Sequence, residues 1–221
     1  MSTEIRTINL GGVNCYLARS PRGFVLIDTG YSGKRALLLN ELEAAGCTPG
    51  MLRLILITHG DADHAGNAAF LRARYGVKIA MHAGDSGMVE KGDMGWNRKS
   101  KPDKMSLIMK VMVSMVNKRV KSGSFEKFSP DFTVDDNFDL TPFGLEATVL
   151  HLPGHSKGSI GILTKEGDLC CGDLFYNMPG FKFIDTMADH ESSVKKLKGL
   201  TVRTIYPGHG KALPQGYLQN Q

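Results

Sequence analysis

The 221-residue length predicts one domain over residues 1–221, with enough chain for a core that excludes water. Hydrophobic residues make up 42% and charged residues 22% of the chain, and no apolar run reaches the roughly 18 residues that cross a bilayer, so we expect neither disorder nor a transmembrane segment. The net charge of +5 is local, because residues 98–121 carry +7 and the remainder carries −2, so no stable nucleic-acid partner is expected.

Strands and helices alternate in the first half of the chain. In order, the patterns predict a β-hairpin (5–17), a strand (24–27), a helix (33–45), a strand (54–57), a helix (68–75) and a strand (77–81). This alternation is typical of a layered α/β fold.

Residues 103–121 interrupt the alternation. Methionine, isoleucine and valine side chains fall at helical spacing there, with lysines between them, so we expect a helical insert near residues 98–121. Three roles stay open for this insert: packing on its own domain, covering a bound substrate, or joining two chains as a homodimer contact. A helix on a membrane surface fits less well, because the flanks offer only Trp96 as an aromatic anchor.

Strands return after residue 132. The predicted strands are 145–150, 160–164, 169–171 and 204–206, and a helix is predicted over about 191–198. No low-complexity linker or short repeat separates these elements, in keeping with a single domain.

Four candidate metal ligands follow the strand at 54–57 within six positions: His59, Asp61, Asp63 and His64. A loop between a strand and a helix directs several side chains to one spot, where imidazoles and carboxylates stay unpaired unless a cation joins them. A polar turn with a capping aspartate is the alternative. Two histidines that flank two alternating aspartates form a rarer pattern than such a turn, and this favours a metal site.

Later strand ends repeat the theme. His155 follows the strand at 145–150 in a Pro-Gly turn, Asp173 follows the strand at 169–171, and His209 follows the last strand. Glycines beside each of them let the backbone approach a crowded centre. Asp28 also follows a strand, and it either caps a turn or orients a metal ligand from the second shell.

With these motifs in place, the chain resembles the metallo-β-lactamase-fold superfamily, whose hallmark is His-x-His-x-Asp-His followed by a distant His, an Asp and a final His. The resemblance covers nearly the whole chain, including the segment 26–30. It implies a four-layer αββα sandwich with a dinuclear metal site at one edge of the two sheets. Carried over by position, the first metal takes His59, Asp61 and His155, the second takes Asp63, His64 and His209, and Asp173 bridges them.

Asp61 departs from the family pattern, which has histidine at this position. The extra carboxylate favours iron or manganese more than a histidine does, and flavodiiron proteins, which resemble this fold, also have a carboxylate there. We place zinc first for the two divalent metal ions, with iron or manganese as alternatives. A further alternative is that Asp61 leaves the first site without metal.

The resemblance implies a hydrolase in which a metal-bound hydroxide attacks a small ester, lactone or thioester, as in lactonases and glyoxalase II. Asp63 is expected to ligate metal and orient the water. Tyr176 lies three residues after Asp173, where acyl-homoserine-lactone lactonases of this superfamily have a tyrosine that contacts substrate; a packed loop aromatic is the alternative. A phosphodiesterase or nuclease, suggested by the basic insert, and a di-iron redox protein, suggested by Asp61, remain as rival functions.

The remaining histidines and the cysteines fall outside this pattern. His151 is expected beside the site, and His82 and His190 are expected on the surface or as caps. The cysteines, Cys15, Cys47, Cys170 and Cys171, form no Cys-x-x-Cys arrangement and are expected to be reduced, packed thiols. The first residues lack the apolar segment of a secretory signal. We therefore expect a cytoplasmic protein acting on a small molecule.

Overall fold

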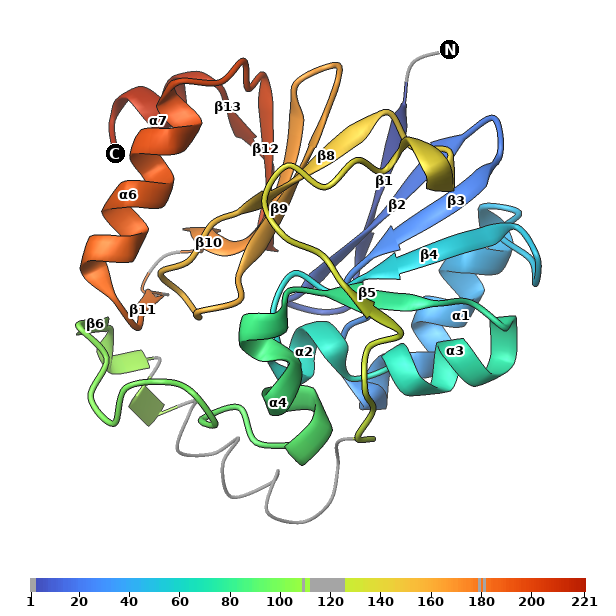
Figure 1. The fold of residues 1–221 in the computed structure, drawn as a ribbon, viewed down its shortest axis with the longest axis horizontal. Helices are drawn as coiled ribbons and strands as arrows, with labels where there is room; N and C mark the ends of the chain where they lie inside the picture. Colours follow the sequence, from blue (N-terminus) through green and yellow to red (C-terminus); the bar gives the residue numbers. More distant parts are fainter. Residues whose placement is uncertain (1–2, 109, 112–125, 179, 181) are drawn as a thin grey trace.

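The structure is a computed structural model that describes residues 3–108, 110–111, 126–178, 180 and 182–221. Its strands form a six-stranded sheet and a five-stranded sheet, and helices cover the outer side of each (Figure 1). This arrangement confirms the four-layer αββα sandwich. None of the helices in the described ranges is both long enough and apolar enough to cross a membrane.

The six-stranded sheet has the order β1-β2-β3-β4-β5-β7. Its strands are β1 (Glu4–Asn9), β2 (Asn14–Ser20), β3 (Gly23–Ile27), β4 (Leu52–Leu56), β5 (Ile79–Met81) and β7 (Phe132–Thr133). The first three strands pair antiparallel, and β3, β4, β5 and β7 run parallel. The helices on this side are η1 (Ser32–Lys34), α1 (Arg35–Ala44), α2 (Ala62–Ala65), α3 (Ala68–Tyr75) and α4 (Ala83–Lys91).

The five-stranded sheet has the order β13-β12-β10-β9-β8. Its strands are β8 (Ala147–His151), β9 (Ile160–Thr164), β10 (Asp168–Asn177), β12 (Thr204–Gly210) and β13 (Leu213–Pro214), and the turn η2 (Thr141–Phe143) precedes them. Only β10 and β12 pair in parallel. Helices α6 (Met187–Lys198) and α7 (Gly216–Gln219) lie on its outer face.

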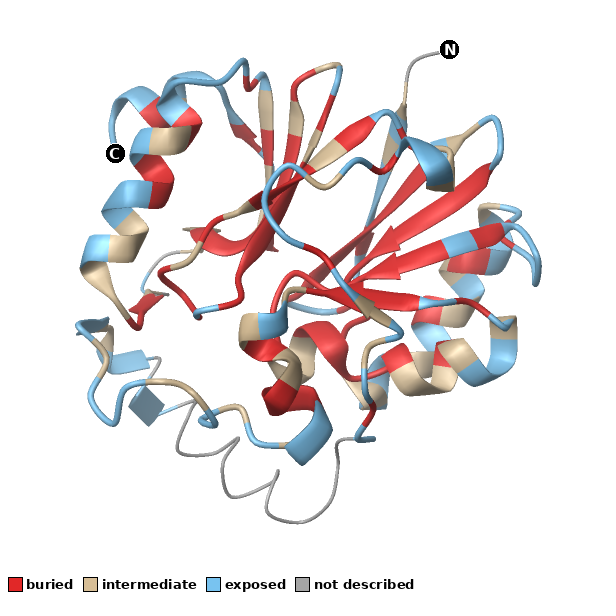
Figure 2. Cartoon of the chain, in the orientation of Figure 1, coloured by how far each residue is buried: buried red, intermediate tan, exposed pale blue. Residues whose placement is uncertain are grey.

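Apolar side chains fill three layers between these elements, and the inner strands of both sheets are largely buried, whereas the edge strand β1 is largely exposed (Figure 2). Val25 and Leu54 point between the sheets, whereas their neighbours Leu26 and Ile55 point toward the helices. Successive strand residues face opposite sides of a sheet, so a strand that is covered on both sides must be apolar throughout. This explains the apolar runs 24–27 in β3 and 54–56 in β4, whereas Arg53 near the start of β4 is exposed.

Several boundaries differ from the sequence expectation. Strand β10 runs from 168 to 177, so Asp173 lies inside the strand and not after it, and His209 likewise lies within β12. The start of the expected insert is not helical, because Lys104–Met105 forms strand β6, which pairs with β11 (Phe183–Ile184).

Residues 107–108 and 110–111 of the insert are helical. Residues 109 and 112–125 lie outside the described residues. The rest of the 103–121 helix, and the three roles left open for it, including the homodimer contact, therefore stay predictions.

Candidate metal centre

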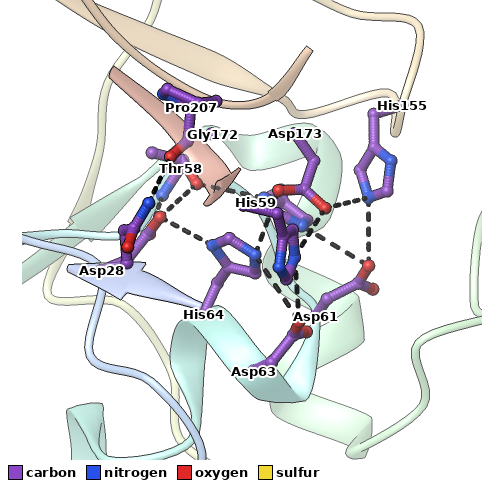
Figure 3. A network of polar contacts seen from close by, with 12 residues as sticks. Asp28, Thr58, His59, Asp61, Asp63, His64, His155, Gly172, Asp173 and Pro207 are labelled. Atoms are coloured by element: carbon purple, nitrogen blue, oxygen red, sulfur yellow. Dashed lines mark hydrogen bonds and ion pairs between the residues drawn. The ribbon is translucent and has the colours of Figure 1, made fainter. Parts of the chain in front are cut away.

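The structure brings the seven expected ligand residues together where strands of both sheets meet, and Figure 3 labels all of them except His209. Four of them follow β4, in the loop and the short helix α2: His59, Asp61, Asp63 and His64. The other three belong to the second sheet: His155 after β8, Asp173 within β10 and His209 within β12. Because each sheet supplies part of the set, the site exists only when the two sheets pack together.

Three groups of side chains among the described residues could hold a cation; one is His82, Asp135 and His151, and the other two are formed by the expected ligands. In the first of these two, the ligand atoms of His59, His155 and Asp173 lie within 4.8 Å of one another. In the second, those of Asp63, His64 and His209 do so. All of the side chains in these two groups except Asp63 belong to buried residues. The expected division into two sites is therefore present in the geometry, but Asp173 takes the place of Asp61 in the first group.

Asp173 also touches the second group. Its Oδ1 lies 3.3 Å from His64 Nε2, and its Oδ2 lies 3.3 Å from His209 Nε2 and 3.9 Å from His155 Nε2. These contacts are compatible with the bridging role that the resemblance implied, which stays a prediction.

Asp28 orients two of the histidines. Its Oδ1 accepts a hydrogen bond from the Thr58 backbone N–H (2.7 Å), and its Oδ2 accepts from Thr58 Oγ1 (2.7 Å) and from His64 Nδ1 (2.8 Å). Since the Thr58 hydroxyl donates to the carboxylate, it accepts from His59 Nδ1 at 3.0 Å. Both imidazoles thus carry a proton on Nδ1 and direct Nε2 inward, the arrangement that metal ligands need. The expected orienting role of Asp28 is the one that its contacts favour.

The other two histidines have their own acceptors. His209 Nδ1 donates to the Gly12 carbonyl oxygen at 2.6 Å. His155 Nδ1 faces the Tyr176 hydroxyl at 2.9 Å and the Phe183 carbonyl oxygen at 3.4 Å. In all four histidines Nε2 is the nitrogen that faces the site.

The polar atoms at the centre fit a metal ion. His59 Nε2, His64 Nε2 and Asp173 Oδ1 are buried and form no hydrogen bond among the described residues, although His64 Nε2 and Asp173 Oδ1 face each other at 3.3 Å. Leaving a buried polar atom unsatisfied costs about 1–3 kcal/mol, so an arrangement with three of them at one spot points to a cation that they would bind. Imidazole nitrogens and carboxylate oxygens are ligands of zinc.

Glycines make room for this packing. A Cβ on Gly208 would lie 2.2 Å from Asp173 Oδ1 and 2.6 Å from His64 Cε1, which no side chain tolerates. Gly172 has a φ of 51°, and a Cβ there would lie 2.7 Å from Thr58 Oγ1. The glycines beside the ligands are thus required by close approach of the backbone.

Asp61 lies at the site, but its carboxylate pairs with Arg98, a residue outside the expected ligand set. Its Oδ2 lies 3.4 Å from His59 Nε2 and 3.0 Å from His155 Nε2. Both of its oxygens also accept hydrogen bonds from the Arg98 guanidinium, at 2.7 and 2.9 Å. Burial raises the pKa of Asp61, but the Arg98 charge and the contacts with His155 and His59 together outweigh burial and hold the pKa well below the ordinary value. Sequence reasoning did not find Arg98 as a site residue.

Asp85 in helix α4 is a second residue that the sequence did not reveal. It is fully buried and accepts hydrogen bonds from Gly60 N (3.1 Å), Ser156 Oγ (2.6 Å) and Gly158 N (2.8 Å). These donors lie in the loops that carry His59 and His155. One carboxylate therefore fixes both ligand loops to each other.

We expect Asp85→Asn to lower the free energy of unfolding by about 1–3 kcal/mol, because the amide turns a donor toward groups that also donate. Denaturant unfolding of the metal-free protein measures this. Asp93→Asn, at an exposed residue two positions after α4, is the matched control and should stay within about 0.5 kcal/mol of wild type. Equal losses in the two variants would contradict the role of Asp85.

We expect metal binding to release protons, because His209 and His64 are protonated in the metal-free site. Burial by itself lowers the pKa of His209, but Asp173 and Asp63 raise it to about 10, and carboxylates raise the pKa of His64 well above its ordinary value. Below these pKa values the ring nitrogens hold protons that a cation must displace. Metal affinity should therefore fall as the pH is lowered from about 10. Calorimetry of zinc binding at pH 7 in buffers of different ionisation enthalpy should show proton release; enthalpies independent of buffer would contradict it.

Tyr176 lies beside the centre. Its ring stacks on His209 at 5.8 Å between centroids, and its hydroxyl contacts His155. His151, which was expected to lie beside the site and not among the ligands, stacks its ring on His82 at 4.1 Å, and its Nε2 donates to the Lys157 carbonyl. The His82 side chain accepts a hydrogen bond from Gly84 N, so His82 caps helix α4. Capping is one of the two roles that the sequence predicted for it.

A family model described as the metallo-beta-lactamase superfamily matches residues 8–209. The chain belongs to the metallo-β-lactamase superfamily. The match includes every expected ligand of the metal centre, and it confirms the resemblance that the motifs indicated. Membership of this superfamily supports a metallohydrolase and leaves the substrate open.

Relatives show how far the likeness extends. The Beta-lactamase-like protein 2 homolog of Caenorhabditis elegans is 26% identical over 92% of this chain, and the chain spans 58% of that protein's length. The Acyl-coenzyme A thioesterase MBLAC2 of Homo sapiens is 25% identical over 89% of this chain and 72% of its own length. Among solved structures, the class B3 di-zinc metallo-β-lactamase LRA-12 from an Alaskan soil metagenome has a TM-score of 0.70 at 19% identity. The match covers 94% of the chain described here and 76% of LRA-12. At that identity the last likeness shows the fold alone.

Proposed function

We propose that this protein is a metal-dependent hydrolase of small thioesters, esters or lactones, with thioesters first. The observation that carries the proposal is the pair of ligand groups around Asp173, with three buried, unsatisfied polar atoms at its centre. The superfamily membership supports hydrolysis, and the name of the human relative, an acyl-coenzyme A thioesterase, supports the thioester class. Zinc is the proposed metal, with iron or manganese as alternatives.

The metal ions would be held by His59, His155 and Asp173 on one side and by Asp63, His64, His209 and Asp173 on the other. When bound, divalent cations polarise a carbonyl group and lower the pKa of water. The chain itself positions the reactants. The Asp63 side chain is 18% exposed, so it reaches solvent at the mouth of the site, and we assign it the orientation of the attacking water.

Tyr176 acts as a hydrogen-bond donor in this proposal. Burial and the nearby Asp173 and Asp61 carboxylates raise the pKa of its phenol well above the ordinary value, so the hydroxyl keeps its proton at neutral pH. A protonated phenol beside His155 is placed to donate to the carbonyl or leaving-group oxygen of a substrate.

Tyr176→Phe should lower kcat/KM about 10- to 100-fold, since it removes one donor to the reacting group and leaves the metal ligands in place. Steady-state kinetics on the best substrate and zinc content per chain measure the two effects. Unchanged kinetics would make Tyr176 a packing residue, the alternative that the sequence left open.

A panel of thioester, lactone, ester and phosphodiester substrates tests the function itself. We expect zinc-loaded protein to hydrolyse a thioester, ester or lactone, to lose the activity with chelator and to regain it with zinc. Turnover that is insensitive to chelator would overturn the metal-dependent mechanism. Phosphodiester turnover alone would support the rival phosphodiesterase or nuclease function, whose one favourable feature is the basic insert.

The di-iron redox alternative loses its support in the structure, because Asp61, the residue that suggested it, is paired with Arg98. A cytoplasmic location and a homodimer are parts of the proposal. The four cysteines are buried free thiols, which supports a reducing compartment.

A further inference from the structure

Arg98 occupies the first ligand group in the manner of a cation. Its guanidinium donates to both oxygens of Asp61 and, from Nη2, to His155 Nε2 at 2.9 Å. The side chains of Arg98 and Asp61 are only 12% and 13% exposed. Bidentate pairing of a guanidinium with a carboxylate is among the strongest hydrogen-bonded contacts that proteins form. Two of the three ligands that the family pattern assigns to the first metal are therefore already engaged.

The segment around Arg98 holds it in this position. The next residue, Lys99, donates its backbone N–H to Asp185 Oδ1 at 3.0 Å, and Met105 further along pairs with Phe183 in the β6–β11 ribbon. The guanidinium carbon lies 5.0 Å from the centre of the Phe183 ring. Arg98 is thus fixed from two sides and is not a mobile surface arginine.

The second ligand group differs in this respect. The Asp63 carboxylate lies 3.3 Å from His209 Nε2 and 3.8 Å from His64 Nε2. No described arginine or lysine forms an ion pair with Asp63. A metal ion must therefore compete with a guanidinium at the first group, whereas no described arginine or lysine is paired with Asp63 at the second.

We propose that Arg98 is a resident cation that competes with metal for Asp61 and His155, so that the protein binds one metal ion tightly at the Asp63–His64–His209 group and a second only weakly at the His59 group. An ion that enters the His59 group must displace the guanidinium from His155, and this leaves a nearly buried Arg98 without one of its partners. A state competent for the second ion that is populated at about 1–10% weakens its apparent affinity about 10- to 100-fold. The inference rests on the proposed metal centre.

Zinc titration of metal-free protein tests the proposal, with bound zinc per chain measured by elemental analysis after gel filtration. Wild type should retain about one ion and Arg98→Met about two, with the second ion bound about 10- to 100-fold more tightly than in wild type. Lys101→Met removes the same charge from an exposed position in the same segment and should behave as wild type. Arg98→Lys keeps the charge but loses the bidentate contact, and it should fall between wild type and Arg98→Met.

The melting temperature gives a readout independent of stoichiometry. Without metal, Arg98→Met leaves Asp61 unpaired and should melt below wild type, and zinc should raise its melting temperature by more than that of wild type. If Arg98→Met fails to fold, the Arg98→Lys titration decides the question alone. Wild type that retains two ions as tightly as Arg98→Met would overturn the role of Arg98 and leave the proposed function intact. Absence of zinc binding in every variant would overturn both.

Discussion

Asp173→Asn is expected to lower kcat more than about 100-fold, beyond the 10- to 100-fold range typical of residues that only support metal ligands. The Asp173 carboxylate contacts both ligand groups, at 3.3 Å from His64 and His209 and 3.9 Å from His155. The neutral amide keeps the shape of the side chain but removes the negative charge from a buried spot that we assign to two cations. Kinetics on the substrate found in the panel, together with zinc content, measure the effect.

Asp168→Asn is the matched control for this variant. It makes the same substitution at the start of the same strand, β10, away from the ligand groups. Its kcat and zinc content should equal those of wild type. An Asp173→Asn enzyme that keeps wild-type kcat would contradict the bridging role.

Asp28→Asn is expected to weaken zinc binding about 10- to 100-fold, the range seen when the partner of a metal-bound histidine is lost. The Asp28 carboxylate is 1% exposed and accepts three hydrogen bonds, two of them from Thr58 and one from His64. An amide places its NH2 group against one of these donors. The backbone favours asparagine as the probe, because Asp28 has a φ of 61°, which asparagine adopts more readily than alanine does.

Competition with a zinc-binding dye measures this affinity. Asp139→Asn serves as the control, since Asp139 also accepts two hydrogen bonds, both from Thr141, but lies outside the ligand groups. Zinc affinity unchanged by Asp28→Asn would show that the orientation of His64 does not depend on the carboxylate.

The gathering of the candidate ligands could be predicted because most of their placement follows local rules. Four of the ligands lie within six residues, where one strand end and one short helix fix their spacing. Each of the other three ligands has a glycine nearby. The close packing around Gly172 and Gly208 leaves no room for a larger residue at those two positions. Their exact context was harder to predict. Asp173 lies within a strand because β10 continues past an irregularity in its pairing with β12. The order of the seven ligand residues in the sequence gives no information about where that strand ends.

The residues that sequence reasoning missed depend on long-range contacts. Arg98 and Asp85 pair with residues 37 and 25 positions away, and nothing in their neighbourhood distinguishes them from surface charges. Helix α4, which carries Asp85, contains two glycines, and glycine disfavours a helix by about 1 kcal/mol each. Its hydrogen bonds to the ligand loops and the burial of Met88 stabilise it, and both arise only in the folded chain. The stacking of His151 on His82 also joins residues far apart in the chain, and the strand position of His151 gave no information about it.

Anomalous diffraction from crystals grown with zinc tests the central claim most directly. We predict a zinc peak enclosed by Asp63, His64, His209 and Asp173, with a weaker peak or none at the His59 group in wild type. A map with no zinc peak at the Asp63–His64–His209 group, from crystals of folded protein saturated with zinc, would contradict the account.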